Sequence, residues 1–347
     1  GLIVFRVIYY AVPAIVALCT VVMQQPRLPL PAGHPAHWGL ARQNGQIQTA
    51  AGQHCYVARL PFFVCTIGGQ THRFDIARFQ TAALWRATCA VLYNCSGPMA
   101  AHAALAGWHV RRTTMEALIR PQNWSLNGKH RQSLRRKLKH AELAGVHVCS
   151  GTYATHPEIA KIARTWKIAH GGELGFSMGR FCPRYVAKQR LFLIIHQETV
   201  QGFVSFHVGQ NDWHLDLIRY RPGLPDGAIH AAIVKAIITA RCENIGLVSL
   251  ATVPDPRYTP AFWANRRQGL AQFKRSFGPV WVARYHAAPN KFAFWASGIA
   301  IAIAVHRPVA NLAWRILQLI NLLPLELKFI PKRDKRRLQQ NQRPQNS

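Results

Sequence analysis

The segment from Leu191 to Val253 constrains the fold most, because its apolar pattern predicts three strands, a loop, a helix and a fourth strand. Leu191 to His196 is an apolar run. After a Gln-Glu turn, Val200 to Val208 alternates apolar and polar side chains, which predicts a β-hairpin. Trp213 to Tyr220 continues as a third strand. Its two predicted faces carry Trp213, Leu215 and Leu217 on one side and His214, Asp216 and Ile218 on the other.

A Pro- and Gly-containing loop then separates the third strand from a helix. Arg221 to Gly227 breaks the alternation, and Asp226 is the predicted N-cap of this helix. Ala228 to Cys242 has Ile and Ala at helical spacing, and Leu247 to Val253 is a β-rich run predicted to lie beside the third strand. The segment therefore predicts a compact α/β core.

This order of elements resembles the core of the GNAT acyltransferase fold. In that fold the loop before the helix presents backbone N–H groups to an anionic or carbonyl group. An ordinary α/β core without transfer chemistry has the same pattern, since a fold does not determine a function. The element order alone leaves both interpretations open.

The charge of the chain points to a polyanionic partner. The chain has 347 residues, enough for about two domains, and its 49% hydrophobic content excludes a disordered protein. Lys and Arg number 43 against 13 Asp and Glu, which gives a net charge of +30. Nucleic acid and an anionic bilayer both fit this excess, and general basicity of the source proteome is the alternative. The eight Cys and 17 His show no metal-binding spacing, so we predict no metal site.

The chain divides into five predicted regions. Residues 1–25 contain an apolar run, Leu2 to Met23, long enough for a transmembrane helix, and the Pro-containing residues 26–52 are typical of a linker. Residues 53–150 are predicted to form a first GNAT-like subdomain, with a hairpin or two short strands at 56–67, a helix at 78–93 and a short helix at 99–106. Residues 151–288 form the second, catalytic subdomain, and 289–347 a membrane-associated end. The first subdomain is a candidate degenerate copy of the second.

A basic helix is predicted from Lys129 to Gly145. Arg131, Arg135 and Lys139 follow at i, i+4 and i+8 with Arg136 beside them, and Leu134 and Leu138 form the buried stripe. Like charges in such a ladder destabilise an isolated helix, so an anionic ligand is expected along it. RNA phosphates are the preferred ligand over lipid head groups, and a solvated basic face is the alternative.

Two carboxylates are the candidates for holding an amine. Glu173 lies among glycines in the segment 171–181, and Asp216 lies on the predicted third strand. Because an unpaired carboxylate within a sheet is costly, Asp216 is predicted to bind Arg219 or a ligand. In a basic chain each of these acids creates a strong local negative potential.

Several short motifs resemble one known family. They include Phe176-Ser-Met-Gly-Arg-Phe181, Leu215-Asp-Leu-Ile-Arg-Tyr220 with Pro225-Asp-Gly-Ala228, Phe273-Lys274 and Arg284-Tyr285. Upstream, Met115-Glu-Ala117 and Gly128-Lys-His-Arg-Gln-Ser-Leu-Arg135 add to the match. Together they resemble the C-terminal catalytic domain of the lysylphosphatidylglycerol synthases, also called multiple peptide resistance factors, over about residues 95 to 287.

The resemblance implies a tandem pair of GNAT-like folds that transfers an aminoacyl group, lysyl or alanyl, from a charged tRNA to phosphatidylglycerol. It implies a location at the bacterial cytoplasmic membrane with the catalytic domain on the cytoplasmic side, and no cofactor. The residues it implies as catalytic are Glu173, Asp216, Arg219 and Lys274. Those it implies for substrate binding are Glu116, Phe176, Ser177, Arg284 and Tyr285. The basic residues assigned to tRNA are Lys129, Arg131, Arg135, Arg136 and Lys139.

Two positions depart from the family's pattern, and both bear on the identity of the amino acid. His230 stands where the family commonly has Asp, and Leu250-Ala-Thr-Val-Pro254 replaces a more glycine-rich strand end. Two other functions remain open: a coenzyme A-dependent acyltransferase acting on a lipid amine, and a non-catalytic module that binds RNA or an anionic membrane.

The C-terminal region has membrane-binding character. The apolar run from Phe292 to Val305 is too short for an ordinary span, and core packing is its alternative role. Val309 to Leu323 is amphipathic and predicts a helix lying in the membrane interface. Lys332 to Arg337 is a basic tail that anionic lipids attract.

Overall fold

A computed structural model describes residues 46–50, 53–68, 74–84, 88–153, 156, 158–255, 257 and 264–306. The predicted membrane span from Leu2 to Met23, the amphipathic helix from Val309 to Leu323 and the basic tail lie outside these residues, as does most of the predicted linker. Within them no helix is both long and apolar enough to cross a membrane.

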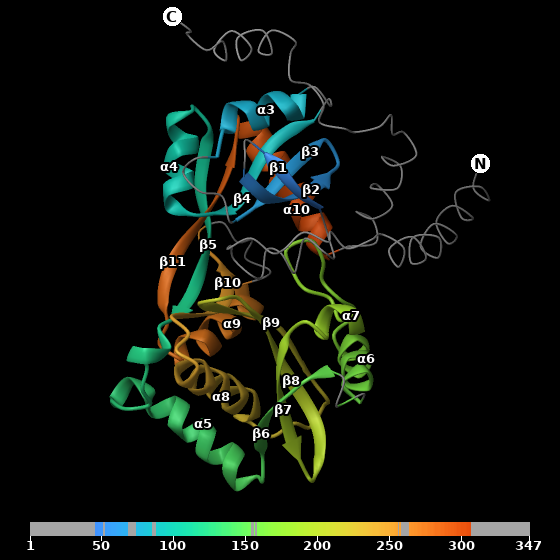
Figure 1. Ribbon diagram of the computed structural model, residues 1–347, viewed down its shortest axis with the longest axis vertical. Coiled ribbons are helices and arrows are strands. Elements are labelled where there is room, and N and C mark those ends of the chain that lie inside the picture. The colour runs from blue at the N-terminus through green and yellow to red at the C-terminus, as the bar shows by residue number, and fades with distance from the viewer. Residues whose placement is uncertain are drawn as a thin grey trace, which may run out of the picture.

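The described chain forms a mixed α/β fold around one sheet of eleven strands in the order β1-β2-β3-β4-β11-β5-β10-β9-β8-β7-β6 (Figure 1). The first five strands are β1 (Gln46–Ala50), β2 (Gln53–Leu60), β3 (Phe63–Ile67), β4 (Cys89–Cys95) and β5 (His109–Ile119). The others are β6 (His147–Gly151), β7 (Arg190–His196), β8 (Thr199–Val208), β9 (Asp212–Tyr220), β10 (Leu247–Pro254) and β11 (Val280–Ala288).

Eight helices and two short 3-10 turns accompany the strands in the described residues. The helices are α3 (Ile76–Leu84), α4 (Gly97–Leu105), α5 (Gln132–Leu143), α6 (Ile159–Ala169), α7 (Pro183–Val186), α8 (Ala228–Cys242), α9 (Ala264–Ser276) and α10 (Lys291–His306). The 3-10 turns are η1 (Pro121–Asn123) and η2 (Lys129–Arg131).

The element order predicted from Leu191 to Val253 is confirmed. β7, β8 and β9 pair antiparallel in sequence, α8 follows the loop, and β10 returns parallel to β9. The predicted cap of α8 is wrong. Gly227 is the N-cap residue, with φ of 87°, and Asp226 instead binds Lys137 of α5 at 2.5 Å. A Cβ at Gly227 would lie 2.0 Å from the carbonyl oxygen of Lys137, so a glycine is required where α5 meets this loop.

The predicted alternation along β9 is wrong after Asp216. The pairing of β9 with β8 shifts by one residue between Leu215 and Ile218, and the backbone N–H of Leu217 donates to Ser205 Oγ at 3.0 Å. As a result Leu217 packs with α6 and α7, whereas Ile218 packs with Trp213 and α8. A β-bulge shifts the two-residue period, and this one places Asp216 and Arg219 together on the face opposite α8.

The first half of the chain repeats the topology of the second. β3, α3 and β4 form a parallel crossover like that of β9, α8 and β10. β4 continues through α4 into β5, which pairs with β10, while β10 continues through α9 into β11, which pairs with β4. The two halves therefore exchange their last strands, and β5 and β11 pair with each other at the centre.

One of the predicted helices has another boundary in the structure. The predicted helix at 78–93 ends at Leu84, and its last residues belong to β4. The segment from Gln268 to Tyr285 contains the end of α9, as far as Ser276, and then the first residues of β11. Residues 150 and 151, the predicted boundary between subdomains, both lie in β6.

Different helices cover the two faces of the β6–β10 half of the sheet (Figure 1). α5 and α8 enclose a core with Phe192, Phe206 and Trp213. α6 and α7 pack on the alternate side chains, among them Leu193, Phe203 and Leu217. In the other half, α10 packs on β2, β3 and β11, and α3 and α4 pack on their own cluster.

Candidate active site

The candidate site lies where β10 leaves β9. The two strands pair only over 247–249 of β10, while β10 continues along β5. The pairing of β10 with β5 shifts between Ser249 and Thr252, and Ala251 in this bulge has φ of 63°. A non-glycine residue in this conformation is uncommon, and such strain is found at functional sites. The bulge is stabilised locally, because the Ala251 N–H donates to Ser249 Oγ at 3.1 Å.

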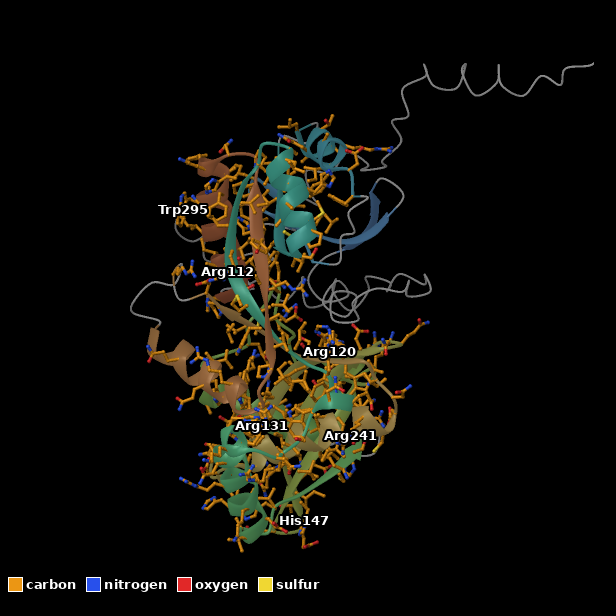
Figure 2. The ribbon with its side chains drawn as sticks, turned by 90° about the vertical axis from the view of Figure 1, so that its left-hand side faces the viewer. Arg112, Arg120, Arg131, His147, Arg241 and Trp295 are labelled. Carbon is orange, nitrogen blue, oxygen red and sulfur yellow. The ribbon has the colours of Figure 1, made fainter. Side chains whose placement is uncertain are left out.

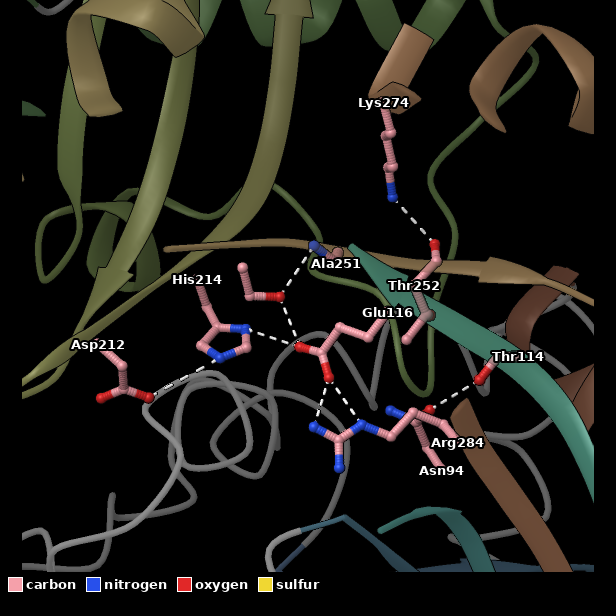
Figure 3. Close-up of polar contacts among 10 residues, drawn as sticks. Asn94, Thr114, Glu116, Asp212, His214, Ala251, Thr252, Lys274 and Arg284 are labelled. Carbon is pink, nitrogen blue, oxygen red and sulfur yellow. Dashed lines mark hydrogen bonds and ion pairs between the residues drawn. The ribbon is translucent and has the colours of Figure 1, made fainter. Parts of the chain in front are cut away.

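Glu116 of β5 is the centre of a buried polar cluster (Figure 3). Its side chain is nearly inaccessible, and Ser249 Oγ donates to Oε1 at 2.5 Å. Arg284 of β11 donates to Oε2 from Nε at 2.7 Å and contacts the same oxygen through Nη2 at 2.5 Å. His214 Nδ1 of β9 lies 3.8 Å from Oε1. The cluster therefore joins four neighbouring strands, and Arg284 neutralises the buried carboxylate.

Lys274 of α9 reaches the same region from the other side of β10 (Figure 3). Its Nζ donates to the carbonyl oxygen of Thr252, in the bulge, at 3.0 Å. Burial lowers the pKa of this amine from 10.5 to about 7, against the opposing effect of the Glu116 carboxylate. At neutral pH a substantial fraction of Lys274 is therefore uncharged and able to accept a proton.

Glu173 and Arg219 form a second charged pair. Arg219 Nη2 lies 2.5 Å from Glu173 Oε2, and both side chains are largely buried. The guanidinium carbon lies 3.8 Å from the ring centroid of Trp166 in α6, and Trp166 stacks on His170 at 4.1 Å. Asp216 is expected from the sequence to bind Arg219 or a ligand. The pairing with Arg219 is wrong, because the Arg219 guanidinium binds Glu173 instead.

Asp216 belongs to a separate buried network. Gln189 Nε2 donates to Asp216 Oδ2 at 2.7 Å, and His207 Nε2 lies 3.3 Å from the same oxygen. Burial raises the pKa of Asp216, but the charge of His207 and hydrogen bonds from His207, Gln189 and Tyr185 outweigh it and leave the pKa below its ordinary value. A Cβ at Gly179 would lie 2.1 Å from Asp216 Oδ1, so the loop carrying Glu173 packs directly on this carboxylate.

Phe176 and Ser177 lie in the same loop, further toward α10. Phe176 has φ of 57°, is buried, and packs against Tyr93 with ring centroids 5.9 Å apart. A hydrogen bond between Ser177 and Tyr93 partly offsets the burial that raises the Tyr93 pKa. Tyr285 is different: it packs with the α3 and α4 cluster rather than with its neighbour Arg284 at Glu116.

The predicted tRNA-binding residues are divided by the structure. Arg131 precedes α5, is buried, and donates to the carbonyl oxygens of Ser125 and Gly278, both at 3.4 Å. Arg135 donates to the carbonyl oxygens of Leu126 and Gly128. Lys129, Arg136 and Lys139 are exposed. The predicted ladder through Arg131, Arg135 and Lys139 is thus wrong as a single helical face, and α5 covers the face of the sheet opposite Arg219.

Four polar residues of these networks are not among the residues predicted from the sequence: His207, His214, Ser249 and Gln189. His207 and His214 are adjacent in register on β8 and β9, a signal that strand pairing would have supplied. Ser249 and Gln189 have no signal in the sequence.

His230 is one of the two positions that depart from the family pattern, and its ring lies among other rings. Its centroid is 4.7 Å from that of Phe273 and 5.5 Å from that of Phe277. Burial lowers its pKa to about 4, so this histidine is neutral. The described residues contain no cluster of three His, Cys, Asp or Glu suited to a metal ion.

A comparison with known protein families shows to which family the chain belongs. The family "Phosphatidylglycerol lysyltransferase, C-terminal" matches residues 58–288, well over half of the sequence. The chain belongs to this family. The match begins in β2 and ends with β11, so it includes every residue of the Glu116 cluster.

Two curated proteins show how distant the relationship is. The phosphatidylglycerol lysyltransferase of Bacillus subtilis (strain 168) is 25% identical over 209 residues, which cover 52% of this chain and 24% of that protein. The lysylphosphatidylglycerol biosynthesis bifunctional protein LysX of Mycolicibacterium gilvum is 25% identical over 231 residues, covering 62% and 21%. The chain thus spans less than a quarter of the length of either relative.

Two solved structures of the family have the same fold. The C-terminal domain of a putative lysylphosphatidylglycerol synthetase from Agrobacterium fabrum has a TM-score of 0.70 at 20% identity, covering 84% of this chain and 96% of that one. L-PGS from Bacillus licheniformis has a TM-score of 0.69 at 18% identity, covering 78% and 92%. The likeness includes both halves of the sheet.

Proposed function

We propose that this protein transfers an aminoacyl group, lysyl or alanyl, from a charged tRNA to phosphatidylglycerol at the cytoplasmic face of a bacterial membrane. The observation that carries the proposal is the buried cluster of Glu116, Arg284 and Lys274 at the strained bulge of β10, in a chain of this family. In this interpretation two GNAT-like units share the central strands β5 and β11, and the reaction takes place where β9 and β10 diverge.

The chemistry requires positioning more than a strong base, because an aminoacyl ester is already activated. A glycerol hydroxyl of the lipid attacks the ester carbonyl, the bond to the ribose oxygen of the tRNA breaks, and the hydroxyl proton ends on that oxygen. Uncharged Lys274 accepts the proton and returns it to the leaving oxygen. Arg284, held by Glu116, supplies positive charge to the developing oxyanion or to the lipid phosphate.

The remaining predicted residues have supporting tasks in this proposal. Glu173 and Arg219 border the site on the side of α6, where Glu173 attracts the α-amine of the aminoacyl group. Asp216 acts through its contact with the Gly179 backbone and positions the loop that carries Glu173, Phe176 and Ser177. The exposed residues Lys129, Arg136 and Lys139 bind tRNA phosphates outside the site.

The test uses the full chain with phosphatidylglycerol vesicles and total charged tRNA that carries labelled amino acids. We expect labelled lipid, and none after ribonuclease treatment. Glu116→Gln should abolish the label, because Arg284 loses its charged partner, while the control Glu142→Gln changes an exposed acid of α5 and should retain activity.

Other outcomes distinguish the two alternatives. Lipid labelling that persists without intact tRNA, or that requires acyl-coenzyme A, would contradict the proposal in favour of a coenzyme A-dependent acyltransferase. Retention of tRNA or vesicles without any labelled lipid would indicate a binding module. The identity of the label in the lipid reports whether lysine or alanine is transferred.

A further inference from the structure

α10 is apolar around its whole circumference, but the residues that the structure describes pack against it on one side only. Its sequence from Phe292 to Val305 contains no charged residue. The inner side is buried against β2, β3 and β11 through Ala293, Phe294, Ser297, Ile301 and Ala304. A helix that is hydrophobic on every side is normally enclosed by protein or lipid, and the described part of the chain covers only the inner side of this one.

The outer side carries four large exposed side chains. Phe292 is 82% exposed, Trp295 60%, Ile299 63% and Ile303 48%. Their spacing of three, four and four residues places them along one stripe of the helix, opposite the buried residues. Figure 2 shows Trp295 at the outer edge of the molecule, directed away from the sheet. Single exposed apolar residues are ordinary, but a continuous stripe marks an interaction surface.

We propose that this stripe of Phe292, Trp295, Ile299 and Ile303 is a membrane-docking surface that lies in the interface of an anionic bilayer. At 16 residues, α10 is about 24 Å long, which suits a helix in the membrane plane rather than one across it. Tryptophan is favoured at the boundary between head groups and acyl chains.

Charge selects the bilayer over a second copy of the chain. The net charge of +30 opposes self-association and favours an anionic surface. The 41 residues that follow His306 contain nine Lys and Arg and two acids, so the chain beyond this helix is also basic. An apolar stripe followed by basic residues combines the two attractions that bind an interfacial helix to anionic lipid.

The docking surface is directly connected to the candidate active site. The N–H of Gly175 donates to the carbonyl oxygen of Val305 at 2.8 Å, and Phe176 packs in the cluster beneath α10. Glu173, two residues before Gly175, binds Arg219. A bilayer against the outer side of α10 therefore lies one helix thickness from the loop that borders the site, which suits an enzyme whose acceptor is a membrane lipid.

The first experiment isolates Trp295 from the nine other tryptophans of the chain. Fluorescence of the full-length protein and of Trp295→Phe is measured on phosphatidylglycerol vesicles that contain lipids brominated on the acyl chains. We expect stronger quenching of the unsubstituted protein than of the variant, which keeps an aromatic residue but loses the fluorophore. Equal quenching would place Trp295 outside the bilayer and overturn the proposal, even if another segment anchors the chain. No tRNA is present, so the result does not depend on the proposed transfer reaction.

The second experiment compares two double variants in vesicle flotation. Ile299→Ser with Ile303→Ser should weaken binding by roughly tenfold or more, because two large apolar side chains leave the interface. The control, Leu143→Ser with Ile168→Ser, alters residues that are 77% and 76% exposed on α5 and α6 and should bind like the unsubstituted protein.

Two outcomes of the same variants would show that the stripe has another occupant. A lower melting temperature of Ile299→Ser with Ile303→Ser, in the absence of lipid, would mean that the chain itself covers the stripe. A change from dimer to monomer in sedimentation would mean that a second copy covers it. Either result overturns the membrane surface.

Discussion

Because the amine of Lys274 is buried, we predict that replacing this lysine changes stability and activity in opposite directions. Lys274→Met retains most of the side-chain volume and removes the charge. A pKa lowered from 10.5 to about 7 corresponds to a cost of about 5 kcal/mol for keeping the ammonium buried. The lost hydrogen bond to the Thr252 carbonyl reduces the gain by about 1 kcal/mol. At pH 6 we therefore expect the variant to be more stable by a few kcal/mol and inactive in aminoacyl transfer.

The pH dependence has a definite sign. Below about pH 7 the amine is protonated in both the folded and the unfolded protein, so the cost is fully present. Between about pH 7 and 10.5 the unfolded chain binds more protons than the folded one, so the stability of the unsubstituted protein rises with pH. The advantage of Lys274→Met should consequently be largest near pH 6 and smaller at pH 9.

Urea unfolding of both proteins at pH 6 and pH 9 measures this difference. Lys137→Met is the control, because Lys137 is a partly exposed lysine paired with Asp226 and such pairs contribute little. If Lys274→Met is no more stable than the unsubstituted protein at pH 6, or if its advantage does not change with pH, the assignment of a buried amine with a lowered pKa is refuted.

Two further predictions concern the loop at the site and the basic helix. Gly179→Ala should destabilise the protein by about 1–3 kcal/mol in urea unfolding and impair transfer, because the new Cβ would displace Asp216. Gly269→Ala, in open space on α9, should be neutral or slightly stabilising, and equal effects of the two would contradict the packing argument. Arg136→Ala with Lys139→Ala should weaken tRNA binding and lower the slope of log affinity against log salt by about 1.5–2. An equal loss from Lys161→Ala with Arg164→Ala, which removes the same charge from α6, would show a general charge effect rather than a binding face.

The local elements of the second half could be predicted because their signals are short in range. The apolar run of β7, the period of two in β8, the helical spacing in α8 and the turn residues between them depend on near neighbours, and the structure confirms these elements. Short motifs around Glu116, Asp216, Lys274 and Arg284 also resemble those of the family to which the chain belongs. Charge alone indicated a polyanionic partner.

The tertiary structure alone decided which of these residues meet. A one-residue bulge in β9 put Asp216 and Arg219 on one face and gave them different partners, and no periodicity in the sequence reports a bulge. By its residue type and its spacing from Arg135, Arg131 fits an RNA-binding residue. In the structure it is instead buried, and it donates hydrogen bonds to the backbone carbonyl oxygens of Ser125 and Gly278.

The exchange of β5 and β11 between the halves has the largest consequence. It brings Glu116 next to Arg284, 168 residues later in the chain, and next to Ser249 on the neighbouring strand. Sequence determines local conformation because propensity, capping and periodicity act over a few residues. The pairing of distant strands depends on burial over the whole sheet, so the composition of the site is a property of the folded chain.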